Sequence, residues 1–244
     1  LLTYLTPARV RLGFDRARAR DLNWIFTTHR IPPHPNRFAH IQDQYFEFLS
    51  FLGVDPEPLH FGLELTGKEK EQQRRFFASF HRPPCALVLA TSNPRKNWEP
   101  LGYAEVASRL VSDFGMQPIL VGGTSAAEEN AARVILQQAG ESVLDERGGG
   151  LRRLLWLLDG SDLVISPDTG PLHMARAMET PVIGLFGFTN PKRSGPYRLF
   201  TDLVVDGYTR SPGEPYPVSM ERRRDGMGRI TPEMVLEKVA LARR

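Results

Sequence analysis

The 244-residue sequence has little cysteine: Cys85 is the single one, so an internal disulfide is excluded. Cys85 heads an apolar run, which predicts a small buried side chain, and a reducing compartment fits this usage. The sequence also lacks any apolar run that approaches the roughly eighteen residues of a membrane span. Its first twenty residues do not show the order of regions expected of a signal peptide.

Excess charge of one sign is also missing. The formal net charge is only +3, too small to argue for a nucleic-acid partner. Basic residues gather locally instead, at Arg9, Arg11, Arg16, Arg18 and Arg20 beside Asp15 and Asp21, and again at Arg222 to Arg224. A solvated face and a site for an anionic partner are equally good interpretations of both clusters.

Two phosphate-binding signatures are missing as well. Neither GxGxxG nor GxxxxGK[ST] occurs, so neither the dinucleotide fingerprint nor a P-loop is supported. No His, Cys and Asp residues recur at metal-ligand spacing, and we therefore expect no metal and no cofactor.

The most informative stretch is residues 162–191, DLVISPDTGPLHMARAMETPVIGLFGFTNP. A β-branched run is followed by a Pro-Asp-Thr-Gly-Pro break, and apolar residues then recur at helical spacing before a second apolar run. This order predicts one βαβ unit with a parallel, right-handed crossover. Ligands of such units bind at the carboxyl edge of the sheet.

The turn inside this unit contains several residues that can cap a helix or bind a ligand. Pro171 suits the first turn of a helix, and Asp168, Thr169 or Gly170 could each cap it. A helix N-terminus behind a glycine turn is suited to a phosphate, and His173 lies in the first turn. The alternative is an ordinary capped turn with a packed histidine.

Strand and helix patterns alternate through most of the sequence. Residues 9–14 predict a strand, 41–52 a helix that ends at Gly53, and 67–81 a charged helix. From Cys85 the alternation becomes regular and predicts a doubly wound parallel sheet, closed by a helix at about 231–243. We place a domain boundary between residues 82 and 83, so that residues 1–82 include a linker and 83–244 form the second domain.

Three loops should meet at the carboxyl edge of the sheet. The expected loops are 92–100 with Lys96 and Trp98, 122–125 ahead of Glu128 and Glu129, and 166–170. A lysine opposite a helix N-terminus suits a diphosphate. Taken singly, a lysine such as Lys96 is more often a surface lysine, a tryptophan such as Trp98 a loop anchor, and a pair such as Gly122-Gly123 a tight turn.

The segments SPDTGPLHMARAMETPVIGLFGFTNPKRSGPY, KNWEP, VGGTSAAEE and GRITPEMVL together resemble the family-9 glycosyltransferases, the bacterial lipopolysaccharide heptosyltransferase family. RVRLGFDRAR and NWIFTTHR resemble the later part of that family's N-terminal domain. The resemblance implies an α/β fold of GT-B type with two Rossmann-like domains, the N-terminal one being acceptor-side and incomplete. It also implies inverting, metal-independent transfer from a nucleotide-sugar, typically ADP-heptose, bound by the C-terminal domain.

The resemblance also implies roles for single residues. Asp168 would bind donor-sugar hydroxyls, Thr169 and the Gly170 backbone would hold the diphosphate, and Lys96 would reach phosphate and sugar. Glu128 would bind the ribose, with the adjacent Glu129 as the alternative, and His173 would lie on the phosphate side. The implied acceptor is a phosphorylated lipid A core, and the implied location is the cytoplasmic face of the inner membrane, with peripheral membrane contact.

The family's proposed general base, an aspartate in a glycine-containing motif of the N-terminal domain, has no counterpart in this sequence. We therefore expect that motif upstream of Leu1, in a longer enzyme, and leave the catalytic base unassigned; sequence proximity alone suggests Asp15 or His29. Two alternatives to a transferase stay open. The chain could bind a nucleotide-sugar without catalysis, or act as a GT-B nucleotide-sugar epimerase.

Overall fold

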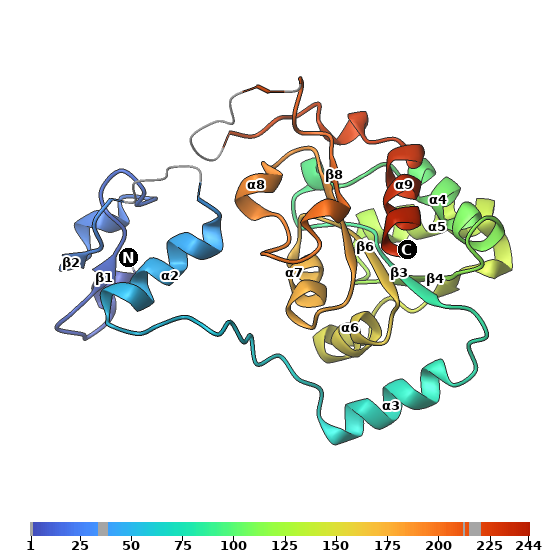
Figure 1. Cartoon of the computed structure of the whole chain (residues 1–244), viewed down its shortest axis with the longest axis horizontal. Coiled ribbons are helices and arrows are strands. Elements are labelled where there is room, and N and C mark those ends of the chain that lie inside the picture. The colour runs from blue at the N-terminus through green and yellow to red at the C-terminus, as the bar shows by residue number, and fades with distance from the viewer. Residues whose placement is uncertain (1, 34–38, 212, 215–220) are drawn as a thin grey trace. The chain divides into compact units, whose positions relative to one another are not determined.

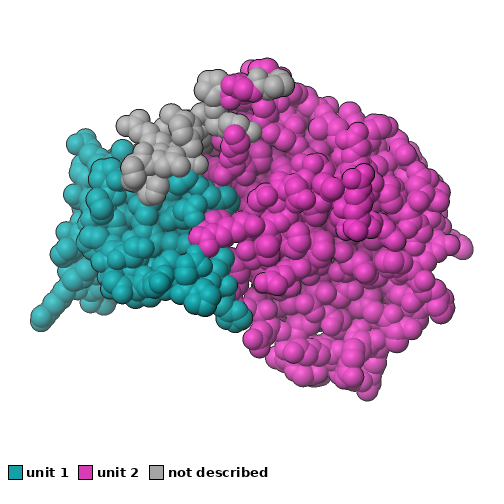
Figure 2. All heavy atoms as spheres, in the orientation of Figure 1, with its two compact units in different colours: residues 1–60 teal, residues 61–244 magenta. Residues whose placement is uncertain are grey.

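A computed structural model describes residues 2–33, 39–211, 213–214 and 221–244. The chain divides into two compact units, residues 1–60 and residues 61–244, which Figure 2 distinguishes by colour. The division falls between His60 and Phe61, about twenty residues before the boundary expected from the sequence.

Unit 1 contains a short parallel pair of strands, β1 (Leu12–Gly13) and β2 (His29–Arg30). The strand expected over residues 9–14 is therefore much shorter than predicted. Pairing stops because the Arg11 N–H donates to the Thr28 hydroxyl at 2.8 Å instead of to a strand carbonyl. A short helix α1 (Leu2–Leu5) precedes β1, and the 3-10 helix η1 (Asn23–Ile25) lies between the two strands in sequence.

Helix α2 (Ile41–Phe51) confirms the helix expected over residues 41–52. It begins where the His40 side chain accepts a hydrogen bond from the Gln42 N–H. It ends before Gly53, whose φ of 76° is a conformation that glycine adopts at little cost. The Phe14 ring packs edge-on against Phe48, with ring centroids 4.8 Å apart, and joins the strand to the helix.

Unit 2 is built on a six-stranded, fully parallel sheet in the order β5-β4-β3-β6-β7-β8. Its strands are β3 (Pro84–Val88), β4 (Gln117–Val121), β5 (Leu144–Asp145), β6 (Leu163–Pro167), β7 (Val182–Phe186) and β8 (Val204–Asp206). The chain starts at β3 in the middle, moves outward to β5 and returns to β6 on the other side. This doubly wound order has its switch point between β3 and β6.

Helices cover both faces of this sheet (Figure 1). One face carries α4 (Pro100–Ser112), α5 (Ala126–Ala139) and α9 (Pro232–Ala242); the other carries α6 (Gly150–Asp159) and α7 (Gly170–Ala177). The short elements of this unit are α8 (Pro191–Ser194), η2 (Pro94–Lys96), η3 (Gly140–Ser142), η4 (Thr201–Leu203) and η5 (Met227–Arg229). The expected doubly wound sheet and closing helix are confirmed.

The core lies on both faces of the sheet because every described strand from β3 to β7 except β5 is buried on both sides. In β3, Cys85 and Leu87 point into one apolar cluster while Ala86 and Val88 point into the other. Cys85 is fully buried, as the sequence predicted, and burial raises the pKa of its thiol.

Helix α3 (Gly67–Phe77) explains why the unit boundary differs from the expected one. Its Gln73 amide donates to the Trp156 carbonyl at 2.8 Å, and the Phe76 ring packs edge-on against the Trp156 ring at 5.4 Å. Glu69, which caps the helix start, also forms an ion pair with Arg152 of α6. The helix expected in the linker is thus part of the packing of unit 2.

Within the described ranges, no helix is both long and apolar enough to cross a membrane.

Candidate functional site

Three neighbouring strands, β3, β6 and β7, end at the same edge of the sheet. The loop after β3 carries Lys96, the turn after β6 carries Asp168, and the loop after β7 carries Thr189. The Lys96 ammonium donates to Asp168 Oδ2 at 2.7 Å and to the Asp168 carbonyl at 3.0 Å. The Thr189 hydroxyl donates to the same Oδ2 at 2.6 Å. Because β3 and β6 flank the switch point, the Lys96–Asp168 ion pair spans the position where doubly wound sheets bind ligands.

The local sequence fixes the loop that carries Lys96. The Asn97 side chain accepts from the Thr91 N–H at 2.8 Å, and the Asn93 side chain caps η2 by accepting from the Arg95 N–H. Trp98 is 2% exposed and its indole N–H donates to the Ile230 carbonyl at 3.0 Å. Trp98 is therefore a loop anchor, one of the two interpretations of the sequence.

Asp168 is ionised although its side chain is only 9% exposed. Burial alone would raise the pKa of its carboxyl, but interactions with His173, Lys96 and Thr189 outweigh burial and lower the pKa to about 2. Oδ2 accepts from both Lys96 and Thr189, whereas His173 Nε2 lies 3.7 Å from Oδ1. The two carboxylate oxygens thus have different surroundings: Oδ2 is held by two short hydrogen bonds, and Oδ1 is left to one longer contact.

The start of α7 answers the capping question that the sequence left open. Thr169 is the N-cap residue by position, but its side chain makes no cap hydrogen bond, and the Asp168 carboxylate is turned toward Lys96. A Cβ added to Gly170 would meet nothing within 4 Å, so this end of the helix faces open space. An uncapped N-terminus beside a lysine can bind an anion such as phosphate.

Glu128 lies beyond β4, one strand further out than Lys96. Its carboxylate accepts from the Gly123 N–H at 2.6 Å, the Ser125 N–H at 2.9 Å and the Ser125 hydroxyl at 2.6 Å, and forms a capping box for α5. Burial alone would raise the pKa of the Glu128 carboxyl. These hydrogen bonds lower the pKa by more than burial raises it, so the net shift is downward. The structure thus gives Glu128 a capping role; its ribose role stays a prediction.

The adjacent Glu129 is exposed and lies 3.4 Å from Arg147, whose guanidinium is held by Asp145 at 2.8 Å. Of the two acidic candidates for the ribose, Glu128 is the one that faces the Gly122-Gly123 turn. Gly122 has a φ of 129°, and an added Cβ would lie 2.7 Å from Glu128 Oε1. The chain bends at Gly122, which agrees with the tight-turn interpretation of this glycine pair.

Sequence reasoning missed Thr189. A single threonine carries no motif, and the available signal was only its place two residues beyond the Gly187 that follows β7. Carboxyl ends of neighbouring parallel strands share one edge, so any polar residue in that loop was a candidate.

The N-terminal arginine cluster is in part a structural feature. Arg18 pairs with Asp15, donates to both oxygens of Glu47 at 2.8 Å and donates to the Pro32 carbonyl at 2.8 Å. Arg16 lies over the Trp24 ring, 4.6 Å from its centroid. Asp15 is only 8% exposed, and His29 is exposed with a contact to the neighbouring Thr28 hydroxyl at 3.0 Å.

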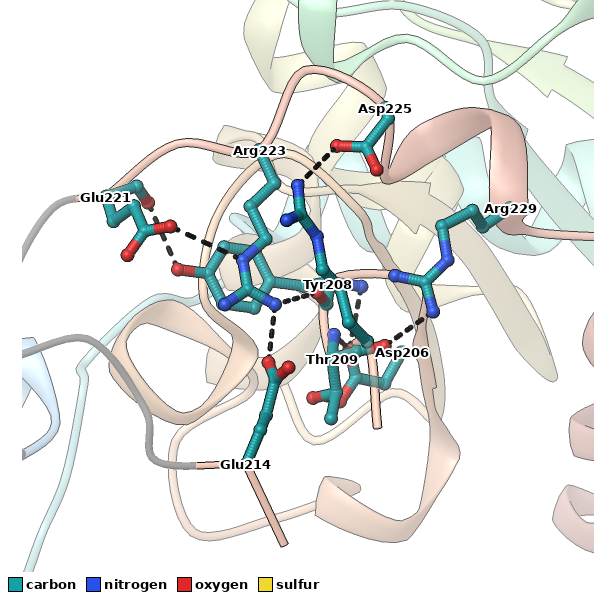
Figure 3. A network of polar contacts seen from close by, with 9 residues as sticks. Asp206, Tyr208, Thr209, Glu214, Glu221, Arg223, Asp225 and Arg229 are labelled. Carbon is teal, nitrogen blue, oxygen red and sulfur yellow. Dashed lines mark hydrogen bonds and ion pairs between the residues drawn. The ribbon is translucent and has the colours of Figure 1, made fainter. Parts of the chain in front are cut away.

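The second cluster, Arg222 to Arg224, lies in the loop after β8, and its three arginines differ. Arg223 is enclosed by polar contacts with Glu214, Glu221 and the Tyr208 carbonyl, as Figure 3 shows. Its guanidinium carbon lies 4.3 Å from the centroid of the Tyr208 ring. Arg222 and Arg224 are exposed. The middle arginine is therefore a packing residue, which neither interpretation of the sequence anticipated.

Among the residues described, no group of three or more His, Cys, Asp or Glu side chains is arranged to hold a metal ion.

The strand order defines a Rossmann-like α/β domain. The uncapped helix and the charged pair at its switch point are suited to an anion. Comparison with known proteins gives the family. The family model described as glycosyltransferase family 9 (heptosyltransferase) matches residues 1–212, and the chain belongs to this family.

Curated relatives agree with this assignment. The lipopolysaccharide core heptosyltransferase OpsX of Haemophilus influenzae is 29% identical over 207 residues, which cover 84% of this chain and 58% of the relative. The lipopolysaccharide heptosyltransferase 2 of Escherichia coli K12 is 28% identical over 202 residues, covering 75% and 54% of the two chains. The chain thus spans little more than half the length of these relatives.

Solved structures show the same fold. A family-9 glycosyltransferase from Veillonella parvula superimposes with a TM-score of 0.72 at 20% identity, covering 96% of this chain and 67% of that one. The Escherichia coli heptosyltransferase WaaC, solved with ADP, superimposes with a TM-score of 0.64 at 20% identity, covering 96% and 66%. The expected α/β fold of GT-B type with parallel sheets is confirmed.

Proposed function

We propose that this chain is part of an inverting glycosyltransferase. The enzyme would transfer a heptose from a nucleotide-sugar, ADP-heptose, to a phosphorylated lipopolysaccharide core acceptor. Transfer would take place at the cytoplasmic face of the inner membrane and would need no metal ion or other cofactor. One observation carries the proposal: in a family-9 chain, Lys96 and Asp168 form a short ion pair at the switch point, directly before the uncapped N-terminus of α7.

Each residue of this arrangement suits one part of the donor. The Gly170 N–H and the dipole of α7 suit the diphosphate, and the Lys96 ammonium adds a full positive charge beside it. The Asp168 carboxylate stays ionised, so it can accept hydrogen bonds from sugar hydroxyls through Oδ1. His173, 46% exposed in the first turn of α7, lies 3.7 Å from Asp168 Oδ1 through Nε2, and we assign it to the phosphate side as part of this proposal.

In inverting transfer, the acceptor hydroxyl attacks the anomeric carbon and displaces the nucleoside diphosphate from the opposite face. The oxygen–carbon bond to the diphosphate breaks with both electrons leaving on the diphosphate, while a base takes the proton of the hydroxyl. Positive groups at the leaving diphosphate stabilise the charge that develops there. Lys96 and the start of α7 would supply this stabilisation; the base stays unassigned.

Binding and transfer are tested separately. Calorimetry with ADP should show binding to the chain in the presence of EDTA, and a strict need for a divalent ion would contradict the metal-free proposal. Transfer is measured with radiolabelled ADP-heptose and a lipid A core acceptor, and NMR of the product gives the anomeric configuration. A product with retained configuration would contradict inversion.

For this chain by itself, binding of the nucleotide-sugar without transfer is the second candidate, and the state of Asp15 favours it. Asp15 was suggested as a base on sequence proximity, yet its carboxylate is buried against Arg18 and the Ala17 N–H. Burial alone would raise the pKa of this carboxyl, but the interactions with Arg18 and the Ala17 N–H outweigh burial and lower the pKa, so Asp15 is a weaker base. Binding of ADP-heptose without turnover, with acceptor present, would support this candidate over a transferase.

A further inference from the structure

The loop that follows β8 packs closely against the loop that follows β7, at the residues directly before Thr189. Gly226 packs against Gly187, the first residue after β7. A Cβ built on either glycine would overlap the backbone of the other. Gly226 has φ −68° and ψ −34°, which any residue adopts easily, so space and not conformation demands glycine here.

Two further contacts tie the same segments together. The Arg223 N–H donates to the Phe188 carbonyl at 3.0 Å, and the Gly207 N–H donates to the Phe186 carbonyl at 2.8 Å. A Cβ on Gly207 would also overlap the Gly226 carbonyl. Residues 186, 187 and 188 are therefore each held by the loop after β8, and Thr189 comes next in the chain. We call Gly187, Gly207 and Gly226 the glycine clamp.

A network of polar side chains holds the loop after β8, which carries Gly207 and Gly226 (Figure 3). Arg223 reaches Glu214 and the Tyr208 carbonyl and lies over the Tyr208 ring, while the Tyr208 hydroxyl donates to the Glu221 carbonyl at 3.3 Å. Asp206, the last residue of β8, accepts from the Tyr208 and Thr209 N–H groups at 2.8 and 2.9 Å. Because Arg223 is anchored through its side chain, its backbone N–H stays in place for Phe188.

The Thr189 hydroxyl links the position of this loop to the orientation of the Asp168 carboxylate. Thr189 is one of two donors to Asp168 Oδ2, and with Lys96 it fixes the carboxylate so that Oδ1 is left for a ligand. A small shift of residues 187–188 would move the Thr189 hydroxyl off its 2.6 Å hydrogen bond and let the carboxylate turn.

We propose that Gly226 and Arg223 are positioning residues of the donor site: they hold the β7 loop so that Thr189 keeps the Asp168 carboxylate aimed at the donor sugar. The assignment of Asp168 to the sugar rests on the proposed function. The mechanical link from the clamp to Asp168 does not, and it can be measured without any ligand.

The ligand-free test is a carboxyl carbon NMR titration of the full chain labelled at aspartate, with Asp168→Asn used to assign the signal. Lys96 from η2 and His173 from α7 are the charged or titratable groups that face Asp168, and both are unchanged in every clamp variant. Thr189→Val removes the hydroxyl and should raise the Asp168 titration midpoint by about one pH unit. Gly226→Ala should raise it in the same direction, and Thr189→Ser should restore it.

The matched control is Gly228→Ala, in the same loop, where an added Cβ would meet nothing within 4 Å. It should leave the midpoint where it is. If Gly226→Ala does not fold, Arg223→Gln takes its place, with the exposed Arg224→Gln as its control. A clamp variant that is folded, even at a lower melting temperature, and that keeps the parent midpoint would overturn the proposal.

The second readout separates this proposal from the proposed function. Calorimetry with ADP and with ADP-heptose should show that Gly226→Ala and Thr189→Val lose about tenfold in affinity for ADP-heptose and less than twofold for ADP. Equal losses for both ligands would overturn the link to the sugar. A parent chain that binds neither ligand would overturn the proposed function and the sugar assignment with it, whereas the NMR titration would still decide whether the clamp positions Asp168.

Discussion

Lys96 Nζ lies 2.7 Å from Asp168 Oδ2, and this ion pair joins two loops that are 72 residues apart in the chain. The pair bridges β3 and β6, the two strands between which the doubly wound sheet reverses direction. A cation and an anion at such a point can serve opposite parts of one ligand, the diphosphate and a sugar hydroxyl. Their mutual hydrogen bond keeps both in place when no ligand is bound.

Lys96→Ala should weaken ADP binding by about 1.5 to 3 kcal/mol, the range for a hydrogen bond to a charged group. Added salt should weaken binding to the parent more than to the variant, because one charge of the interaction is gone. Calorimetry at two ionic strengths measures both effects. Lys70→Ala, an exposed lysine on α3, is the control. Equal ADP affinity in the parent and a folded Lys96→Ala would return Lys96 to an ordinary surface lysine.

Asp168 should make the stability of unit 2 sensitive to acid. Its carboxyl has a pKa of about 2 in the folded chain against a usual 3.8, so between these values the unfolded chain binds more protons. The contribution is present above pH 3.8 and is lost as the pH falls through 2; its size is about 2 kcal/mol. Urea unfolding of the parent and Asp168→Asn between pH 5 and pH 2.5 should show their difference in unfolding free energy shrinking. A difference that does not change with pH would contradict the prediction.

Glu128 should show two separable functions, one in the helix cap and one at the ribose. Ser125→Ala removes the capping partner and should cost about 1 kcal/mol of stability while leaving ADP affinity within twofold. Glu128→Gln should weaken binding of ADP but not of 2′,3′-dideoxy-ADP, since the hydroxyls that the carboxylate would bind are missing from the second ligand. Calorimetry with both nucleotides measures this. Equal losses for both ligands would show that Glu128 acts only through the turn.

The regular part of unit 2 was predictable because its signals are local. Helix α5 at 126–139 and strand β7 at 182–186 lie where apolar periodicity and flanking Gly or Pro mark their bounds in the sequence. Lys96 and Asp168 were found from their loops by the same reasoning. The carboxyl edge of a parallel sheet collects such loops whatever the strand order.

The features that sequence reasoning missed depend on distant partners. From the sequence, the phenylalanines of α3 form the apolar face of a helix in a linker. In the structure they pack against Trp156, about eighty residues further along the chain. In the sequence, Arg223 is one of three adjacent arginines with nothing to distinguish it from its neighbours. Its partners Tyr208 and Glu214 come close only through the fold of the loop. Gly226 has no positional signature in the sequence, because its need for glycine comes from Gly187, nearly forty residues earlier.

The place of α3 predicts where the chain can be cut. A chain that begins at Phe61 should unfold cooperatively near the melting temperature of unit 2 in the full chain. A chain that begins at residue 83 would expose the Trp156 ring and leave Arg152 and Asp159 without their α3 partners. It should melt several degrees lower, because loss of a packed aromatic contact costs about 1 kcal/mol beyond the apolar area exposed. Calorimetric melting compares the two; equal melting temperatures would favour a boundary at 82.

The last prediction concerns Asp15, the buried carboxylate of unit 1. Burial alone would raise the pKa of its carboxyl, but hydrogen bonds from Arg18 and the Ala17 N–H outweigh burial and lower the pKa. The carboxylate is therefore a poor base, and its hydrogen bonds stabilise the fold of unit 1. Arg18 bridges it to Glu47 on α2. Asp15→Asn should therefore destabilise unit 1 by about 1 to 3 kcal/mol and leave ADP affinity unchanged.

Asp21→Asn is the matched control, because Asp21 is exposed and its φ of 52° is one that asparagine tolerates. Stability is followed by urea unfolding with Trp24 fluorescence, and Asp15→Asn combined with Arg18→Gln should cost less than the sum of the single changes because both remove the same ion pair. If instead Asp15→Asn kept full stability and abolished sugar transfer while ADP still bound, Asp15 would be the missing base. In that case the candidate that binds a nucleotide-sugar without transfer would be excluded, since this chain would hold both the donor site and the group that activates the acceptor.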